Sequence, residues 1–176
     1  MLLKNIYFIG PMGTGKTTIG RMLANELNVA FIDSDHEIEA RSGANIPWIF
    51  DVEGEAGFRQ REKQVIADMC ARRDIIMATG GGAIKRMDNR KQLRSSGFIV
   101  YLHTPVSVQL TRIAKDKQRP LIQQVDREKV LTSLLAEREP LYRELADLIL
   151  DTDKLSPRKM INQIILTINA NGVCNA

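Results

Sequence analysis

The sequence predicts an α/β protein whose parallel sheet is covered by helices. Three observations lead to this fold class. Short apolar runs rich in β-forming residues alternate with stretches whose apolar residues recur at helical spacing. The first of these runs leads directly into a glycine-rich turn and then into a helical pattern. Glycine or acidic residues also follow three later runs, at positions where the carboxyl ends of parallel strands would meet.

The first half of the chain contains three of the expected strands, which are short apolar runs suited to a buried sheet. They cover residues 5–9, 29–33 and 74–79. Helical spacing of apolar residues predicts helices over residues 16–28, 36–42 and 55–73, with a short additional helix starting at Pro47. Gly43 is expected to end the second of these helices. Trp48 is expected to pack against the protein rather than to contact a ligand.

The second half contains the remaining two strands, at residues 98–102 and 148–150. Helices are expected over residues 88–96, 106–115 and 126–139, and from Pro157 onward behind a capping Ser156. Pro140 is expected to kink the third of these helices or to restart it. The polar stretch at about 115–129 is expected to be a mobile lid. Residues 169–176 are expected to form a frayed tail.

The length and composition indicate one soluble globular domain covering residues 1–176. Hydrophobic residues make up 44% and charged residues 26%, which are ordinary values for such a protein. The net charge of +4 is mild and suits an enzyme acting on anionic substrates. A nucleic-acid partner is not expected, because the sequence lacks a dense Lys/Arg tract with interleaved aromatic residues.

The cysteines and the N-terminus favour a cytoplasmic protein. Cys70 and Cys174 are far apart in the chain and do not suggest a disulfide framework. His36 and His103 are too isolated for a zinc site. The first strand begins almost at the N-terminus, which leaves no room for a signal peptide, and no uncharged apolar run approaches the roughly 20 residues of a membrane helix. A membrane partner is therefore not expected.

The glycine-rich turn Gly10-Pro-Met-Gly-Thr-Gly-Lys-Thr17 fits the phosphate-binding loop pattern of Gly, four residues, then Gly-Lys-Ser/Thr. Its glycines allow the backbone N–H groups to surround a phosphate, and the following helix adds partial positive charge. Lys16 can reach the outer phosphates, and the hydroxyl of Thr17 can ligate Mg²⁺. The alternative is an ordinary turn with a solvated lysine, and the flanking strand and helix argue against it.

An acidic pair, Asp33 and Asp35, follows the second strand. One carboxylate can face Mg²⁺ through water while the other takes a proton from a hydroxyl nucleophile. The Asp-x-Asp pattern is a weak signal, since the chain repeats it at Asp151-Thr-Asp153. A loop-forming or helix-capping pair is the structural alternative.

A run of three glycines, Gly80 to Gly82, follows the third strand and would let a ligand approach the backbone closely. Arg59 and Arg138 could each be a solvated surface arginine, which is the usual situation for this residue type. Arg119 in the expected lid could move over a bound nucleotide and stabilise charge on the transferring phosphoryl group. A surface position is again the alternative for Arg119.

Taken in order, these motifs resemble the bacterial shikimate kinase family over almost the whole chain, from Asn5 to about Ile168. Each motif is weak alone, but the ordered set is highly specific. The set comprises residues 10–17, Asp33-Ser-Asp35, Ile49-Phe50 with Gly54-Glu55, Phe58-Arg59, Gly80-Gly81-Gly82, Arg119-Pro120-Leu121, and Glu137-Arg138 with Pro140-Leu-Tyr142.

The resemblance implies a three-layer P-loop kinase fold, similar to nucleoside monophosphate kinases, with a five-stranded parallel sheet flanked by helices. It implies ATP-dependent phosphorylation of shikimate at its 3-hydroxyl, giving shikimate 3-phosphate in the pathway to chorismate and the aromatic amino acids. The expected partners are therefore ATP with Mg²⁺ and shikimate, and the expected state is a monomer. Residues at about 34–60 would form the substrate-binding region.

The resemblance also implies roles for individual residues. Shikimate would be held by Asp35, Arg59, Gly81, Gly82 and Arg138. Mg²⁺ would be served by Thr17 and Asp33. ATP would be held by Gly13, Thr14, Gly15, Lys16, Thr17, Thr18, Arg119 and Leu155. The catalytic residues would be Lys16, Asp35 and Arg119.

The sequence departs from the family pattern before the final helix. Family members often place an arginine there against the adenine, whereas this chain has Lys154-Leu155-Ser156-Pro157. The base is therefore expected to be held mostly by backbone and apolar contacts. Residues 122–126 also look short for the family's lid.

Two alternatives remain for the function. A nucleotide-dependent switch is disfavoured, because Asp51-Val-Glu-Gly54 matches only the Asp-x-x-Gly part of GTPase motifs and the guanine signature is absent. A kinase of the same fold acting on gluconate or on a nucleotide is the closer competitor. Arg59 and Arg138 favour a carboxylate substrate, whose geometry matches the guanidinium fork. Gluconate also carries a carboxylate, so only the ordered motif set separates it from shikimate.

Overall fold

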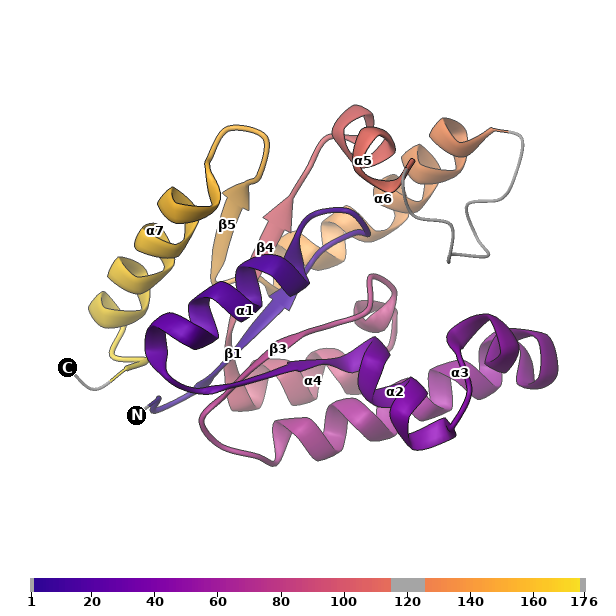
Figure 1. The fold of residues 1–176 in the computed structure, drawn as a ribbon, viewed down its shortest axis with the longest axis horizontal. Coiled ribbons are helices and arrows are strands. Elements are labelled where there is room, and N and C mark those ends of the chain that lie inside the picture. Colours follow the sequence, from indigo (N-terminus) through magenta and orange to yellow (C-terminus); the bar gives the residue numbers. More distant parts are fainter. Residues whose placement is uncertain (1, 115–125, 175–176) are drawn as a thin grey trace.

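A computed structural model describes residues 2–114 and 126–174 (Figure 1). The centre of the molecule is a five-stranded sheet in the order β2-β3-β1-β4-β5. Every neighbouring pair of strands is parallel. The strands are β1 (Asn5–Ile9), β2 (Ala30–Asp33), β3 (Ile75–Ala78), β4 (Gly97–His103) and β5 (Leu148–Asp151). The prediction of an α/β fold with a five-stranded parallel sheet flanked by helices is confirmed.

Helices cover both faces of the sheet, and alternate side chains of each strand point to opposite layers. In β1, Tyr7 and Ile9 belong to one core cluster and Ile6 and Phe8 to the other. Figure 1 shows α1 and α7 on one side of the sheet and α3, α4 and α6 on the other. The helical elements are α1 (Lys16–Leu27), α2 (Ser34–Ser42), α3 (Ile46–Cys70), the 3₁₀ turn η1 (Ala83–Lys85), α4 (Met87–Ser96), α5 (Val106–Ile113), α6 (Arg127–Leu145) and α7 (Pro157–Ala170).

Helix α2 begins at Ser34, two residues earlier than the sequence suggested. The reason is a side-chain cap. Asp33 Oδ1 accepts the backbone N–H groups of Asp35 at 3.1 Å and of His36 at 3.5 Å. A carboxylate at this position satisfies N–H groups that have no partner within the helix. The capping alternative considered for the acidic pair is therefore realised at Asp33.

Helix α3 joins the two helices expected around Pro47 and after Glu55, and it is broken at Gly54. Gly54 has φ 69° and ψ −178°, a conformation that a residue with a side chain rarely adopts. Across the break, the Arg61 guanidinium donates to both carboxylate oxygens of Glu53, at 2.7 and 2.8 Å. Trp48, on the first segment, is 52% exposed, so it packs against the protein only in part.

Two expectations about the C-terminal half need correction. Helix α6 does not end at Glu139 and does not restart, but continues through Pro140 to Leu145, so that of the two alternatives only a kink at Pro140 stays a prediction. Burial of Tyr142 and Leu145 on the core side offsets the backbone hydrogen bond that the proline removes. The segment after α7 is not frayed at Val173, which is 2% exposed and accepts the backbone N–H of Leu3 at 2.8 Å. Antiparallel pairing of residues 2 and 174 ties the two ends of the chain together.

The expected lid falls mostly on residues 115–125, which lie outside the described residues. Its last part is helical, because Asp126 caps α6 by accepting the backbone N–H of Lys129 at 3.1 Å. No helix within residues 2–114 or 126–174 is long and apolar enough to cross a membrane.

Candidate active site

The glycine-rich loop connects β1 to α1 at the carboxyl edge of the sheet. Gly15, immediately before the helix, has φ 89°, which allows the chain to turn into α1 without strain. Lys16 Nζ donates to the carbonyl oxygens of Gly10 at 2.8 Å and Pro11 at 2.7 Å. Thr14 is buried and its hydroxyl donates to the same Pro11 carbonyl at 3.1 Å. The loop is thus closed on itself, with the Lys16 ammonium lying over it.

The two residues expected to serve Mg²⁺ lie in contact. The Thr17 hydroxyl at the start of α1 donates to Asp33 Oδ2, at the end of β2, over 2.7 Å. Hydroxyl and carboxylate oxygens are the hard ligands that Mg²⁺ prefers, and Mg²⁺ in kinases takes few protein ligands because phosphates and waters supply the rest. The described part of the chain has no group of three or more His, Cys, Asp or Glu residues that could hold a metal by itself. The Thr17–Asp33 pair therefore fits a metal bound together with a nucleotide.

Asp35 lies against the three-glycine turn that follows β3. Strands β2 and β3 are paired so that Asp33 is opposite Ala78, and their carboxyl ends bring the two segments together. Gly80 N–H donates to the Ser34 hydroxyl at 3.0 Å. A methyl group at Gly80 would lie 2.6 Å from Asp35 Oδ1 and 3.0 Å from Glu62 Oε1. Gly80 is therefore required because two carboxylates occupy the space next to it.

Arg59 is not a solvated surface residue, since only 13% of its side chain is exposed. Its Nη1 donates to Glu62 Oε2 at 2.8 Å, and its Nε donates to Glu55 Oε1 at 3.3 Å. The guanidinium lies 5.2 Å from the centre of the Phe58 ring. A side chain at Gly82 would overlap this guanidinium, so the glycine turn and the arginine fit closely together.

Arg138 is 6% exposed and approaches the same turn from α6. Its Nη1 would lie 3.7 Å from a methyl group at Gly81. Its buried Nε has no hydrogen-bond partner among the described residues. Buried donors are nearly always paired, so this one is available to a bound acceptor. The two arginines thus flank the glycine turn, one on the Gly82 side and one on the Gly81 side.

Glu62 is a site residue that the sequence analysis missed. It is fully buried, and burial raises the pKa of its carboxyl to about 7, although the neighbouring Arg59 opposes this rise. Its Oε1 atom has no hydrogen-bond partner within the described part of the chain. The signal in the sequence was its position, three residues after Arg59 on the apolar face of α3 that also carries Val65, Ile66 and Met69. A carboxylate on a buried helix face indicates a functional or paired group.

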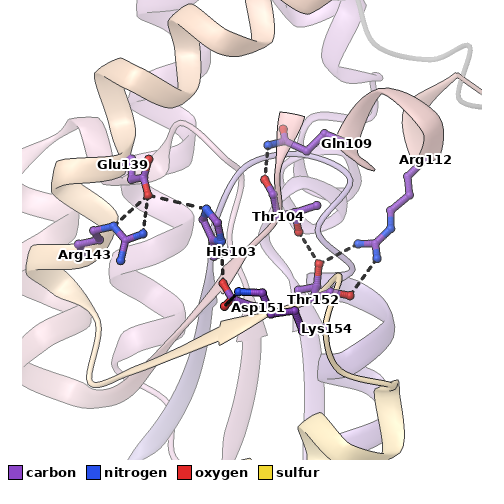
Figure 2. A network of polar contacts seen from close by, with 9 residues as sticks. All are labelled: His103, Thr104, Gln109, Arg112, Glu139, Arg143, Asp151, Thr152 and Lys154. Carbon is purple, nitrogen blue, oxygen red and sulfur yellow. Dashed lines mark hydrogen bonds and ion pairs between the residues drawn. The ribbon is translucent and has the colours of Figure 1, made fainter. Parts of the chain in front are cut away.

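A polar network lies at the ends of β4 and β5, beside the glycine-rich loop (Figure 2). Arg112 of α5 donates to the Gly13 carbonyl at 3.2 Å, to the Thr152 hydroxyl at 3.0 Å and to the Thr152 carbonyl at 3.2 Å. It joins the loop to the segment after β5, where Leu155 packs into the core cluster. Nothing in the sequence distinguished this arginine from others on helices. Its planar guanidinium is suited to stacking on an aromatic ring.

The second acidic pair does not reach the glycine turn. Asp151 is bonded to His103 at 2.8 Å and to Lys154 at 2.9 Å (Figure 2). Both partners lower the pKa of Asp151, and the hydrogen bond from Lys154 has a larger effect than that from His103. Asp151 therefore has a structural role at the end of β5. Of the remaining expected site residues, Thr18 is exposed on the first turn of α1, and Arg119 lies outside the described residues.

The fold and the site together define a P-loop kinase acting on a small molecule. A family model described as shikimate kinase matches residues 12–169. The shikimate kinase of Hahella chejuensis is 55% identical over 96% of this chain and 88% of its own length. The structure of shikimate kinase from Acinetobacter baumannii, solved in complex with shikimate, has a TM-score of 0.93 and 49% identity, covering 98% of this chain and 96% of that one. The chain belongs to the shikimate kinase family, and the sequence-based predictions of family and fold are confirmed.

A more distant neighbour is a gluconokinase from Sinorhizobium meliloti, with a TM-score of 0.60 and 16% identity over 95% of this chain and 92% of that one. At this level of identity the likeness concerns the fold alone. The fold is therefore shared with kinases of other small molecules, while the specific similarity is to shikimate kinases.

Proposed function

We propose that this protein transfers the γ-phosphoryl group of ATP to the 3-hydroxyl of shikimate, giving ADP and shikimate 3-phosphate. This reaction belongs to the route to chorismate and the aromatic amino acids. The observation that carries the proposal is the position of two largely buried guanidinium groups, Arg59 and Arg138, on either side of a glycine turn that also contacts Asp35. A small acid with ring hydroxyls complements this arrangement in charge and in hydrogen bonding.

The substrate carboxylate would be bound by the two arginines. A guanidinium donates two parallel hydrogen bonds to a carboxylate, and such charged bonds are stronger than neutral ones. Arg138 Nε has no acceptor among the described residues, so a bound carboxylate would satisfy a buried donor. The backbone of Gly81 and Gly82 would complete the binding site, because neither residue has a side chain to keep the ligand away.

Asp35 would act as the general base. It lies next to Gly80, on the side of the glycine turn where Glu62 and Arg59 meet. As the hydroxyl oxygen forms its bond to the γ-phosphorus, the bond from that phosphorus to the β,γ-bridging oxygen breaks and the hydroxyl proton passes to Asp35. The positioning of the acceptor hydroxyl and the stabilisation of charge supply most of the catalysis in such reactions.

The nucleotide would lie along the glycine-rich loop. Backbone N–H groups of residues 13–18 and the Lys16 ammonium would contact its phosphates, and Leu155 and Arg112 would border the base. Thr17 and Asp33 would hold Mg²⁺, which when bound would supply positive charge next to the phosphates. Arg119 would contribute a further positive charge near the transferred group, as the family resemblance implies.

We also propose that the protein is a cytoplasmic monomer without a nucleic-acid or membrane partner. None of the described helices could span a membrane.

The proposed function is tested by coupled measurement of ADP release with shikimate, gluconate and nucleoside monophosphates compared side by side. We expect rapid ADP release with shikimate and little above background with the other acceptors. Faster turnover of gluconate than of shikimate would replace the proposed substrate. ADP release at the same rate without any acceptor would indicate a nucleotide hydrolase instead.

A further inference from the structure

Two buried tyrosines stack on each other beneath the glycine turn. Tyr101 of β4 and Tyr142 of α6 are both fully buried, with ring centres 5.0 Å apart and ring planes 21° from parallel. Their phenol groups differ. The Tyr142 hydroxyl donates to the Gly81 carbonyl at 2.5 Å, whereas the Tyr101 hydroxyl has no hydrogen-bond partner among the described residues. Two tyrosines of similar burial therefore differ in the contacts of their hydroxyls, since that of Tyr142 bonds to the Gly81 carbonyl and also lies against Arg138.

The hydrogen bond from Tyr142 fixes a peptide plane. The carbonyl of Gly81 and the N–H of Gly82 belong to the same planar trans peptide, in which the two groups point in opposite directions. No cis peptide bond occurs in the described part of the chain. Holding the carbonyl toward Tyr142 therefore directs the Gly82 N–H away from Tyr142. Gly82 is the residue that lies against the Arg59 guanidinium.

The same phenol is linked to Arg138. The two residues lie one helical turn apart on α6, so their side chains project from the same face. Burial raises the pKa of Tyr142 to about 12, and the nearby Arg138 guanidinium opposes that rise. The phenol is therefore protonated at neutral pH and remains a donor to Gly81. Arg138 in turn approaches Gly81, where its Nη1 would lie 3.7 Å from an added methyl group.

Gly81 also lies against the glycine-rich loop. A methyl group at Gly81 would be 3.5 Å from the Gly10 carbonyl oxygen and 3.6 Å from the Met12 nitrogen. The turn is thus bounded by the loop on one side and by α6 on another. Without a side chain of its own, Gly81 has its orientation set by what its backbone binds, and Tyr142 supplies a short, partly buried hydrogen bond.

We propose that Tyr142 is a positioning residue for the substrate carboxylate, because its hydroxyl fixes the orientation of the Gly81–Gly82 peptide relative to the Arg138 guanidinium. In this arrangement the Gly82 N–H and the Arg138 guanidinium are presented together to one ligand group. Tyr142 itself does not contact the substrate. The inference rests on the proposed function, since it assumes that the carboxylate of shikimate binds at this turn.

The test compares Tyr142→Phe with the matched control Tyr101→Phe, since each removes a single buried hydroxyl from the same stacked pair. We expect Tyr142→Phe to raise KM for shikimate about 10-fold and KM for ATP less than about 2-fold, as loss of one buried hydrogen bond predicts. Tyr101→Phe should leave both KM values unchanged. The rise in KM caused by Tyr142→Phe should fall to about 2-fold when the acceptor is the neutral carboxamide of shikimate, because that analogue lacks the charged group that Tyr142 helps to position.

Several outcomes would overturn the inference. Equal rises in both KM values, a similar effect in the two variants, or the same penalty for shikimate and its carboxamide would each mean that Tyr142 is only a packing residue. An unchanged KM for shikimate in Tyr142→Phe would also overturn it. If the wild-type enzyme turns over no shikimate, the proposed function fails first and this inference fails with it, so the two failures are distinguishable.

A second measurement covers the case in which Tyr142→Phe does not fold. Glycine-selective ¹⁵N labelling of the wild-type enzyme gives at most 12 amide signals, one of which is Gly82. Addition of shikimate should shift the Gly82 signal, while the neutral carboxamide should shift it less. No shift with shikimate at saturation would show that this amide is not presented to the substrate.

Discussion

The two halves of the active site differ in how their polar groups are satisfied. In the nucleotide half, Lys16 and Thr14 donate to carbonyls of their own loop, and Thr17 donates to Asp33. In the substrate half, Glu62 Oε1 and Arg138 Nε are buried without hydrogen-bond partners among the described residues. Buried polar atoms of this kind are uncommon in folded proteins and are costly.

The difference shows where each half obtains its binding energy. The nucleotide half is centred on a contiguous loop whose polar side chains bond to one another's backbone, so a bound nucleotide must displace internal hydrogen bonds of Lys16. The substrate half combines carboxylates and guanidinium groups from α2, α3 and α6 in a buried space. Burying such groups without partners costs free energy, and a bound carboxylate would offset part of that cost by pairing with the guanidinium groups. Substitutions in the first half should therefore affect catalysis, while those in the second should affect substrate binding and stability.

The largest effect is expected at the acidic pair, which lies between the two halves. Asp35→Asn should lower kcat by about 10²–10⁴-fold with the fold intact, because the amide cannot accept the hydroxyl proton. Asp33→Asn should instead raise the Mg²⁺ concentration needed for half-maximal activity, since asparagine still caps α2 but binds the cation less strongly. Steady-state kinetics over a Mg²⁺ titration measures both. Identical behaviour of the two variants would contradict the separate roles.

The next largest effect concerns the nucleotide half. Lys16→Ala should lower kcat by about 10²–10³-fold, the range found when one charge-stabilising donor is removed. Its melting temperature should stay close to that of the wild type, because the Lys16 ammonium bonds to the carbonyls of its own loop and is not part of either core cluster. Turnover at saturating ATP and a thermal melt are the two measurements. Near-normal turnover would remove the loop lysine from the mechanism.

A smaller effect is expected for the substrate half. Arg59→Lys and Arg138→Lys should each raise KM for shikimate by about 10- to 100-fold, because lysine keeps the charge but loses the bidentate fork. KM for ATP should change by less than about 3-fold in both variants. Arg138→Lys should also be the less stable of the two, since Arg138 is more deeply buried. Equal losses for both ligands would point to a folding defect instead.

The smallest effect is a pH dependence of stability caused by Glu62. Its folded-state pKa of about 7 lies above its ordinary value of 4.5, so the folded protein binds more protons than the unfolded chain between these values. The resulting stability is present below pH 4.5 and is lost as pH rises through about 7. Urea unfolding at several pH values should therefore show a loss of about 1–3 kcal/mol between pH 5 and 8 that Glu62→Gln lacks.

Glu55→Gln is the matched control for Glu62→Gln. Glu55 also contacts Arg59, but its side chain is 59% exposed. This variant should keep the wild-type pH dependence. A loss of the pH dependence in Glu55→Gln, or its persistence in Glu62→Gln, would assign the effect to another group.

Much of the fold was predictable because its signals are local. The strands and most helices follow from the alternation of apolar runs with helical spacing, and the break at Gly54 falls between two helices that the sequence separated. The errors came from long-range contacts. Helix α6 passes through Pro140 because its buried face is held by the core, and the segment around Val173 is ordered because it pairs with the N-terminus.

The sequence by itself determined the phosphate-binding loop pattern of this protein and the order of its motifs. A phosphate-binding loop is made by eight consecutive residues, so its chemistry can be read from their spacing. The motif set was also enough to predict the family. The sequence could nominate Arg59 and Arg138 only through that resemblance, because an arginine on a helix is ordinarily exposed.

Only the tertiary structure decided which charged groups are buried together. Glu62, Arg112 and Tyr142 act at the site through contacts with residues far away in the chain, such as Gly80, Gly13 and Gly81. Spacing along the sequence carries no information about such contacts. They matter because burial changes what a side chain does. It raises the pKa of Glu62 and leaves Arg138 Nε without a hydrogen-bond partner among the described residues. It also strengthens the hydrogen bond by which the Tyr142 hydroxyl holds the Gly81 carbonyl.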